Sequence, residues 1–225
     1  MQRSVFGRPT IWWTFVPFAL MSVLHVGALA VGSDLAGPTK LWLMPLLAIP
    51  VLISARLKPR LAIVLLLAAL LFSWLGDGAG FLFPAAPELP LMLGFFGLAH
   101  VAYIVLFLRV LRRRRGMPWW ALVYAVWWVA MIVILGPHTD GLLLAVGVYG
   151  LVLGATAALA TRCRPLVTLG GAFFLVSDTI LAFRLFLPDA MPDWTSPAVM
   201  ATYTLGQGLI VAGALATLRE GKTPR

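Results

Sequence analysis

Long apolar segments and short polar breaks alternate along the whole chain. Each apolar segment holds about 20 residues, the length that an α-helix needs to cross about 30 Å of hydrocarbon. Every break carries a proline or glycine that stops a helix. The pattern predicts helices at about residues 11–33, 39–55, 61–83, 90–111, 118–136, 140–160, 165–187 and 196–218. The segments lack the alternation of a membrane β-barrel, so we predict an all-α membrane bundle of about eight helices, forming a single domain over residues 1–225.

The composition supports lipid as the solvent of this chain. Hydrophobic residues make up 61% of the sequence and charged residues only 11%, whereas soluble domains are about 45–50% apolar and about 25% charged. The single cysteine, Cys163, excludes an intramolecular disulfide. Little sequence remains outside the apolar segments, so no separate soluble domain is expected.

The basic residues are distributed unevenly between the breaks. Of the 17 lysines and arginines, only Lys40 and Arg184 fall on one predicted side of the membrane. The other side receives Arg3, Arg8, Arg56, Lys58, Arg60, Arg109, Arg112, Arg113, Arg114, Arg115, Arg162, Arg164, Arg219, Lys222 and Arg225. By the positive-inside rule we expect both termini in the cytoplasm. The net charge of +9 therefore reflects topology and does not indicate a nucleic-acid partner.

The N-terminus resembles a secretory signal peptide, because a basic start and an apolar run precede Ala28-Leu29-Ala30. The apolar run from Ile11 to Ala30 is longer than a usual signal core, and its removal would leave an odd helix count. We therefore predict a retained first helix. Arginine outnumbers lysine by 14 to 3, as in GC-rich bacterial genomes, so we expect a multi-pass protein of a bacterial cytoplasmic membrane.

Two aspartates lie inside the predicted spans. Asp77 is late in the third helix and Asp178 is past the middle of the seventh. An aspartate at the centre of a spanning helix costs about 2.5–3.5 kcal/mol on insertion scales, and such residues usually serve a function. The alternative is that each carboxyl bonds a neighbouring helix and pins the bundle, although neutral polar residues do this at lower cost. Both helices run outward, so we expect both carboxyls in the outer half of the bilayer.

Other polar residues fall at similar depth and predict a polar cavity. They are Ser73, one turn before Asp77, and Ser177, His100, Tyr103, Tyr149, Tyr203 and Gln207. Taken singly, each fits a hydrogen bond between helices better than catalysis. His25 is a weaker candidate, and His138 is expected in a loop.

The two outer basic residues, Lys40 and Arg184, have two explanations. Each could extend its charge to the membrane interface, or bind an anion such as a lipid phosphate near the carboxylates. The three histidines are dispersed and no cysteine cluster exists, so no metal site is predicted. No phosphate-binding loop or nucleophile elbow appears either, and we expect no cofactor.

A set of short segments stands in order across about residues 38–215: Thr39-Lys40, Phe72-Ser-Trp-Leu-Gly-Asp77, Gly97-Leu-Ala-His-Val-Ala-Tyr103, Val176-Ser-Asp178, and Tyr203 with Gln207. In this ordered set the chain resembles the YhhN-like membrane proteins, the lysoplasmalogenase family. Two positions depart from the pattern: Leu41 follows Lys40 where proline is common, and Arg184 replaces a small polar residue. The resemblance implies an eight-helix hydrolase that cleaves the vinyl ether of lysoplasmalogens to a fatty aldehyde and a glycerophospho head group.

The residues suit that chemistry. A vinyl ether hydrolyses by protonation of its β-carbon to an oxocarbenium ion, which water captures, and two carboxylates can divide these roles as in glycoside hydrolysis. We expect Asp77 and Asp178 to be the acid/base pair, although the sequence does not decide which is protonated. The other polar residues would orient them, with Lys40 first and Arg184 second for the substrate phosphate. The partners expected are a lysophospholipid and membrane lipid.

Two other classes of protein fit the same residues. A proton-coupled transporter also places carboxylates in the membrane, and predicts pH-driven flux without product. A non-catalytic assembly subunit predicts that Asp→Asn changes only reduce stability. The sequence does not predict an oligomeric state.

Overall fold

The computed structural model describes residues 11–220 and is all-helical over that range. Eight of its helical segments are long and apolar enough to span a membrane, which confirms the predicted fold class. The long helices are α1 (Val16–Ala30, after a 3-10 turn at Ile11–Phe15), α2 (Ala36–Ile53), α3 (Arg60–Asp77), α5 (Glu88–Leu106, extended by a π-helical turn at Phe107–Leu111), α6 (Leu122–Leu135), α7 (Leu143–Ala160), α8 (Pro165–Phe186) and α9 (Thr195–Glu220). A short helix, α4 (Ala79–Leu82), follows α3. Arg3, Arg8, Lys222 and Arg225, which entered the charge count, lie outside the described residues.

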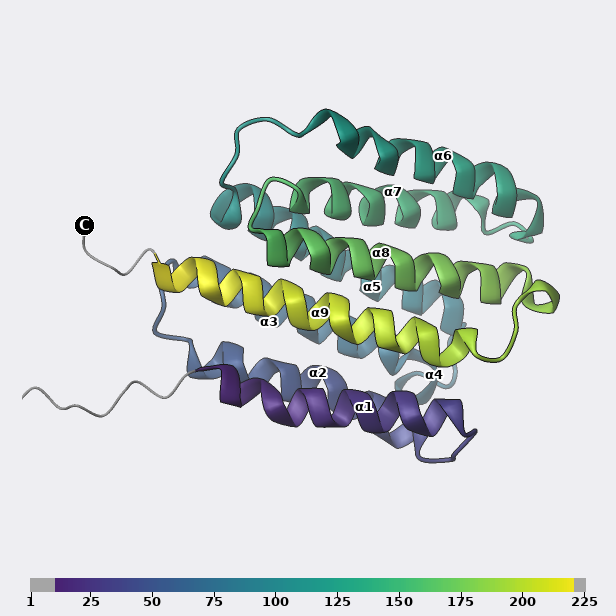
Figure 1. Cartoon of the computed structure of the whole chain (residues 1–225). Helices are drawn as coiled ribbons and strands as arrows, with labels where there is room; N and C mark the ends of the chain where they lie inside the picture. The colour runs from purple at the N-terminus through teal and green to yellow at the C-terminus, as the bar shows by residue number, and fades with distance from the viewer. Residues whose placement is uncertain (1–10, 221–225) are drawn as a thin grey trace, which may run out of the picture.

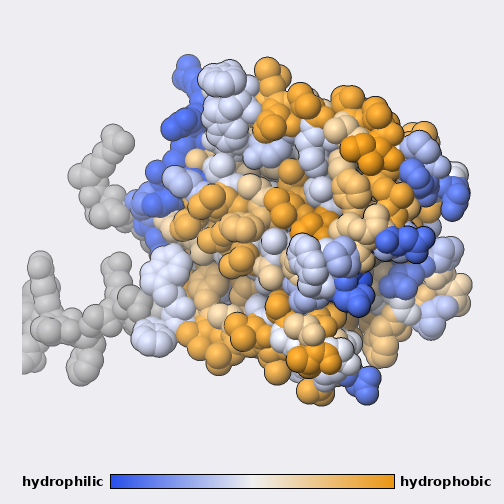
Figure 2. Space-filling model, turned by 45° about the vertical axis from the view of Figure 1, so that its right-hand side comes forward, coloured by the Kyte–Doolittle hydropathy of each residue, from blue (hydrophilic) through white to orange (hydrophobic). Residues whose placement is uncertain are grey.

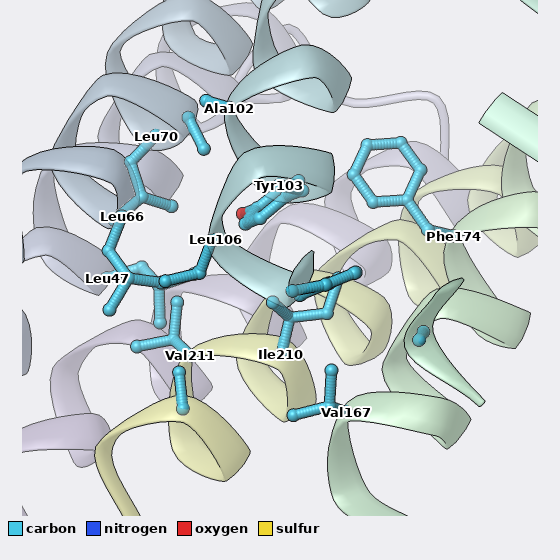
Figure 3. Packing of buried hydrophobic residues seen from close by; sticks show 14 of the residues in the cluster. Leu47, Leu66, Leu70, Ala102, Tyr103, Leu106, Val167, Phe174, Ile210 and Val211 are labelled. Atoms are coloured by element: carbon cyan, nitrogen blue, oxygen red, sulfur yellow. The ribbon is translucent and has the colours of Figure 1, made fainter. Parts of the chain in front are cut away.

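The helices form two layers (Figure 1). One layer runs through α1, α9, α8, α7 and α6, and α2, α3 and α5 lie behind it. The core is where the layers meet, and Figure 3 shows side chains of α2, α3, α5, α8 and α9 converging there. The labelled core residues are Leu47, Leu66, Leu70, Ala102, Tyr103, Leu106, Val167, Phe174, Ile210 and Val211.

Helices α8 and α9 make the most extensive helix pair in the bundle. Two glycines allow this close approach. A Cβ on Gly206 would lie 2.8 Å from the backbone nitrogen of Phe174, and a Cβ on Gly170 would lie 2.8 Å from the carbonyl oxygen of Gly206. Backbones can approach this closely only where small residues face one another. The spacing of α8 and α9 therefore depends on these glycines.

The surface divides into an apolar middle and two polar ends. Figure 2 shows hydrophobic side chains over the middle of one face and hydrophilic ones toward both ends. One end holds the turn between α7 and α8 and the last residues of α9, and we call it the basic end. There Glu220 of α9 pairs with Arg113 and Arg164. The opposite end, which we call the site end, is formed by the ends of α1, α3, α6 and α8 and the starts of α2, α5, α7 and α9. An apolar band between polar ends is the surface that a bilayer requires.

Helix α3 ends at Asp77, before the end of the predicted range 61–83. Gly76, Gly78 and Gly80 weaken the helix here, and the chain resumes as α4 with the N–H of Leu82 bonded to the Gly78 carbonyl at 2.7 Å. A Cβ on Gly78 would lie 2.9 Å from the Leu82 side chain. Asp77 is therefore the last residue of its helix, and its carboxyl lies where the helix gives way to a turn.

The other boundaries differ from the predicted ranges by a few residues, and turns with left-handed residues explain two of these differences. The helix expected at 140–160 begins at Leu143, because Asp140 (φ 44°) and Gly141 (φ 87°) adopt left-handed backbone conformations in a turn. The first helix ends at Ala30, two residues before Gly32 with φ 65°. His138 lies in a short 3-10 turn after α6.

Candidate active site

Asp77 is held by a lysine and a tyrosine from two other helices. The Lys40 Nζ, in the second turn of α2, lies 3.4 Å from Asp77 Oδ1. The Tyr203 hydroxyl, on α9, donates to Asp77 Oδ2 at 2.8 Å. The Asp77 side chain is only 3% exposed, whereas that of Lys40 is 34% exposed. Asp77 thus has both a cation and a neutral hydrogen-bond donor, which together favour a carboxylate.

A hydrogen-bond network extends from Asp77 into the bundle. The Gln207 Nε2 donates to Ser73 Oγ at 2.9 Å and lies 3.5 Å from the Tyr203 hydroxyl. The Gln207 Oε1 accepts from the Tyr103 hydroxyl. Each of these side chains is buried, and Gln207 uses both ends of its amide. Buried polar networks of this kind fix the orientation of their members when every group is satisfied.

Asp178 has a different environment. Its Oδ2 accepts a hydrogen bond from the Tyr149 hydroxyl of α7, and His100 Nε2 of α5 lies 4.0 Å away. Within the described chain neither ring nitrogen of His100 has a hydrogen-bond partner, although His100 is fully buried. No lysine or arginine of the described residues pairs with Asp178. The partners of Asp178 are therefore a neutral phenol and an imidazole.

Two phenylalanines pack against the partners of both carboxyl groups. The Phe174 ring packs edge-on against His100 (centroids 4.6 Å apart) and against Tyr203 (5.4 Å). Phe96 packs edge-on against Tyr203 at 6.0 Å and against Phe174 at 6.4 Å. The partners of Asp178 and Asp77 thus contact the same aromatic wall.

A small cavity adjoins Asp178. It has a volume of about 40 Å³, several times the ~10–15 Å³ that one water needs. Its lining comes from the site ends of α5, α7 and α8 and is apolar except for Tyr149 and Asp178. The apolar lining residues are Met92, Leu93, Phe96, Val146, Leu181, Ala182, Leu185 and Phe186. An alkyl chain is the kind of group that such a lining accepts.

Two of the predicted site residues bind elsewhere. The Ser177 hydroxyl donates to the Val199 carbonyl at 2.9 Å, because it points about 100° around the helix from Asp178. The Arg184 guanidinium donates to Thr195 Oγ1 at 2.5 Å and lies 3.4 Å from the Pro192 carbonyl. Arg184 thus ties α8 to the turn before α9, and Ser177 ties α8 to α9 itself.

The sequence reasoning missed Phe96 and Phe174 as site residues, since a phenylalanine in an apolar helix carries no signal of its own. It also left Thr39 without a role beyond the family motif. Gly76 is explained by packing, because a Cβ there would lie 2.7 Å from the Phe96 ring. Among the described residues, no group of three His, Cys, Asp or Glu side chains could hold a metal ion.

These features define a multi-pass helical membrane protein with two buried carboxylates at one end of the bundle. The chain belongs to the YhhN family, whose family model matches residues 35–214. This confirms the resemblance found in the sequence. No curated protein and no solved structure matches the chain. The match covers both aspartates and their partners, and it begins after α1.

Proposed function

We propose that this protein hydrolyses the vinyl ether bond of lysoplasmalogen-like lysophospholipids, giving a fatty aldehyde and a glycerophospho head group. The observation that carries the proposal is the contrast between two neighbouring buried carboxyl groups. Asp77 has the Lys40 ammonium at 3.4 Å, whereas Asp178 has only Tyr149 and His100. Acid/base hydrolysis through an oxocarbenium ion requires one carboxylic acid and one carboxylate, and unlike environments separate two carboxyls into these roles.

From this contrast we assign a role to each aspartate. Asp178 is the acid: its proton passes to the β-carbon of the vinyl ether, and an oxocarbenium ion forms at the α-carbon. The Asp77 carboxylate stabilises that cation, with Lys40 keeping Asp77 ionised in the resting site. Water adds to the α-carbon and its proton returns to Asp178. The hemiacetal hydroxyl then loses its proton and the glycerol oxygen gains one as the bond between carbon and that oxygen breaks, which releases the aldehyde and the head-group alcohol.

The order of groups across the site end fits a linear lipid. The apolar cavity lies beside Asp178, the aromatic wall of Phe96 and Phe174 follows, and Asp77 with the half-exposed Lys40 comes next. A lysoplasmalogen presents an alkyl chain, a vinyl ether, a glycerol hydroxyl and a phosphate in the same order. The first carbons of the alkyl chain would enter the cavity between α5, α7 and α8, and the head group would face the interface near Lys40.

The direct test is incubation of the purified protein with a panel of lysolipids, followed by mass spectrometry. We expect loss of vinyl-ether lysolipids with release of free aldehyde, and no loss of alkyl-ether lysolipids, which cannot be protonated to an oxocarbenium ion. Absence of product, together with pH-driven solute flux across proteoliposomes, would instead identify a transporter.

We infer that the site end faces away from the cytoplasm, since the basic residues gather at the opposite end. The native cysteine, Cys163, should not interfere with a cysteine-labelling test of this orientation. It is 7% exposed in the α7–α8 turn, and burial raises its pKa to about 12. Little thiolate forms at pH 7.5, so we expect maleimide to label it about a hundredfold more slowly than an exposed cysteine.

Single cysteines then report the orientation. Ala86, before α5 at the site end, and Arg114, at the basic end, are both exposed. We expect a membrane-impermeant maleimide to label Ala86→Cys in intact cells and Arg114→Cys only after permeabilisation. The reverse pattern would refute the proposed orientation.

The contacts of Arg184 predict that it does not bind the substrate phosphate. Because its guanidinium is engaged by Thr195 and Pro192, Arg184→Gln should leave KM within about twofold of the original value. Lys40→Gln, by contrast, should reduce kcat about tenfold or more, since Asp77 loses a charged partner. Steady-state kinetics on both variants measures this. A tenfold rise in KM for Arg184→Gln would show that Arg184 reaches the head group after all.

A further inference from the structure

His25 is a buried histidine on α1 that the proposed mechanism does not use. Its Nδ1 lies 2.9 Å from Thr39 Oγ1. Thr39 has one hydroxyl hydrogen, and it donates that hydrogen to the Leu35 carbonyl at 2.6 Å. Thr39 must therefore accept from His25, which places the imidazole hydrogen on Nδ1 and leaves Nε2 as a bare acceptor.

That acceptor has no partner within the described chain. His25 Nε2 is among the few buried side-chain atoms without a hydrogen bond, and His25 is 1% exposed. Buried polar atoms are normally satisfied, so an orphaned acceptor at a fixed position calls for a donor from outside the chain. The bond to Thr39 prevents the ring from turning Nε2 elsewhere without losing a partner.

His25 lies close to the candidate active site. Its partner Thr39 directly precedes Lys40, whose ammonium binds Asp77. On the other side, α1 packs along α9: Val26 and Gly27 line a groove together with Ala201 and Thr204, which flank Tyr203. His25 is therefore at about the same depth as the Tyr203–Asp77 hydrogen bond. It extends the row of polar groups beyond Asp77, away from the cavity at Asp178.

We propose that His25 Nε2 accepts a hydrogen bond from the free hydroxyl of the substrate glycerol, and so selects lysolipids over lipids in which that oxygen is substituted. This rests on the proposed function. The chemistry excludes the other parts of the substrate. A phosphate diester offers only acceptors, and an ammonium head group would be repelled by Lys40. The hydroxyl next to the ether carbon is the remaining donor of the lipid.

A binding measurement tests this without relying on catalysis. The probes are an alkyl-ether lysolipid, which is not hydrolysed, and its analogue with hydrogen in place of the glycerol hydroxyl. Calorimetry on the full-length protein in detergent should give wild type a preference of about tenfold for the hydroxyl form. His25→Leu should bind both probes with equal affinity. His25→Gln, whose amide can donate to Thr39 and still offer an oxygen, should recover part of the preference.

Ser22→Ala is the matched control, because Ser22 lies one turn earlier on α1 and donates to the Phe18 carbonyl. It should keep the full preference. An equal preference in wild type and His25→Leu would overturn the proposal. Equal binding of both probes by wild type would also overturn it, because it would mean that water satisfies Nε2. If the preference depends on His25 but vinyl-ether lysolipids are not hydrolysed, the hydroxyl site stands and the proposed reaction fails.

Discussion

Asp178→Asn should lower the rate of vinyl ether hydrolysis by about 10²–10⁴-fold, the range that general acid catalysis contributes. Asparagine keeps the shape of the side chain and can still accept from Tyr149, but it has no proton acidic enough to give to carbon. Asp77→Asn should cause a loss of similar order, because a neutral amide does not stabilise the oxocarbenium ion and leaves Lys40 without its charge partner. Aldehyde release from purified variants measures both effects.

Ser177→Ala provides the control beside Asp178. Its hydroxyl binds the Val199 carbonyl and does not reach the site, so activity should stay within about threefold of wild type while stability falls by about 1 kcal/mol. All three variants should elute as wild type does in size-exclusion chromatography. Full activity in both aspartate variants would refute the mechanism and favour a structural role for the carboxyls.

Gly206→Ala should destabilise the protein by about 1–3 kcal/mol, the usual cost of overpacking a tight interface. The added methyl would lie 2.8 Å from the Phe174 backbone nitrogen and 3.0 Å from the Gly170 carbonyl oxygen. Backbone atoms of a helix cannot move aside as a side chain can, so α8 and α9 must separate. Because α8 carries Asp178 and α9 carries Tyr203, activity should fall along with thermal stability.

Gly94→Ala on α5 is the matched control for Gly206→Ala. A Cβ there meets nothing within 4 Å, and Gly94 is exposed at the helix surface. Alanine favours a helix over glycine by about 1 kcal/mol, so this variant should be as stable as wild type or slightly more so. Thermal unfolding in detergent, followed by tryptophan fluorescence, compares the two. Equal stability of the Gly206 and Gly94 variants would show that the interface tolerates a wider spacing.

The number of spans and the clustering of several polar residues around Asp77 could be predicted from the sequence for identifiable reasons. Apolar length is a direct requirement of the bilayer, so the helices could be counted from the chain alone. The spacing of Tyr203 and Gln207 places both on one face of α9, and their bonds to Asp77 and Ser73 show that this face meets α3. Buried polar residues at equal depth had to find one another, because lipid offers them no partner.

What the sequence did not predict depends on which helices become neighbours. Charge and position alone did not separate Lys40 from Arg184, and only the family resemblance ranked Lys40 first. In the structure Lys40 pairs with Asp77 and Arg184 with Thr195. Periodicity gives the face of a helix but not the partner of that face. The break at Gly78 and the wall formed by Phe96 and Phe174 depend on packing between helices distant in sequence. The family match begins after α1, and the bonding of His25 emerges only when α1 lies against α2.

The amide of Gln207 has a consequence for proton movement. The hydroxyls of Tyr103, Ser73 and Tyr203 would form a proton wire leading from Asp77 toward the basic end, but the amide stands between them. An amide donates hydrogen bonds without releasing its protons, so the wire is cut at that point. Beyond it lie close-packed apolar side chains, among them Leu66, Leu106 and Ile210. Asp77 should therefore exchange protons with one side of the membrane only, so that this network does not let protons leak across the bilayer.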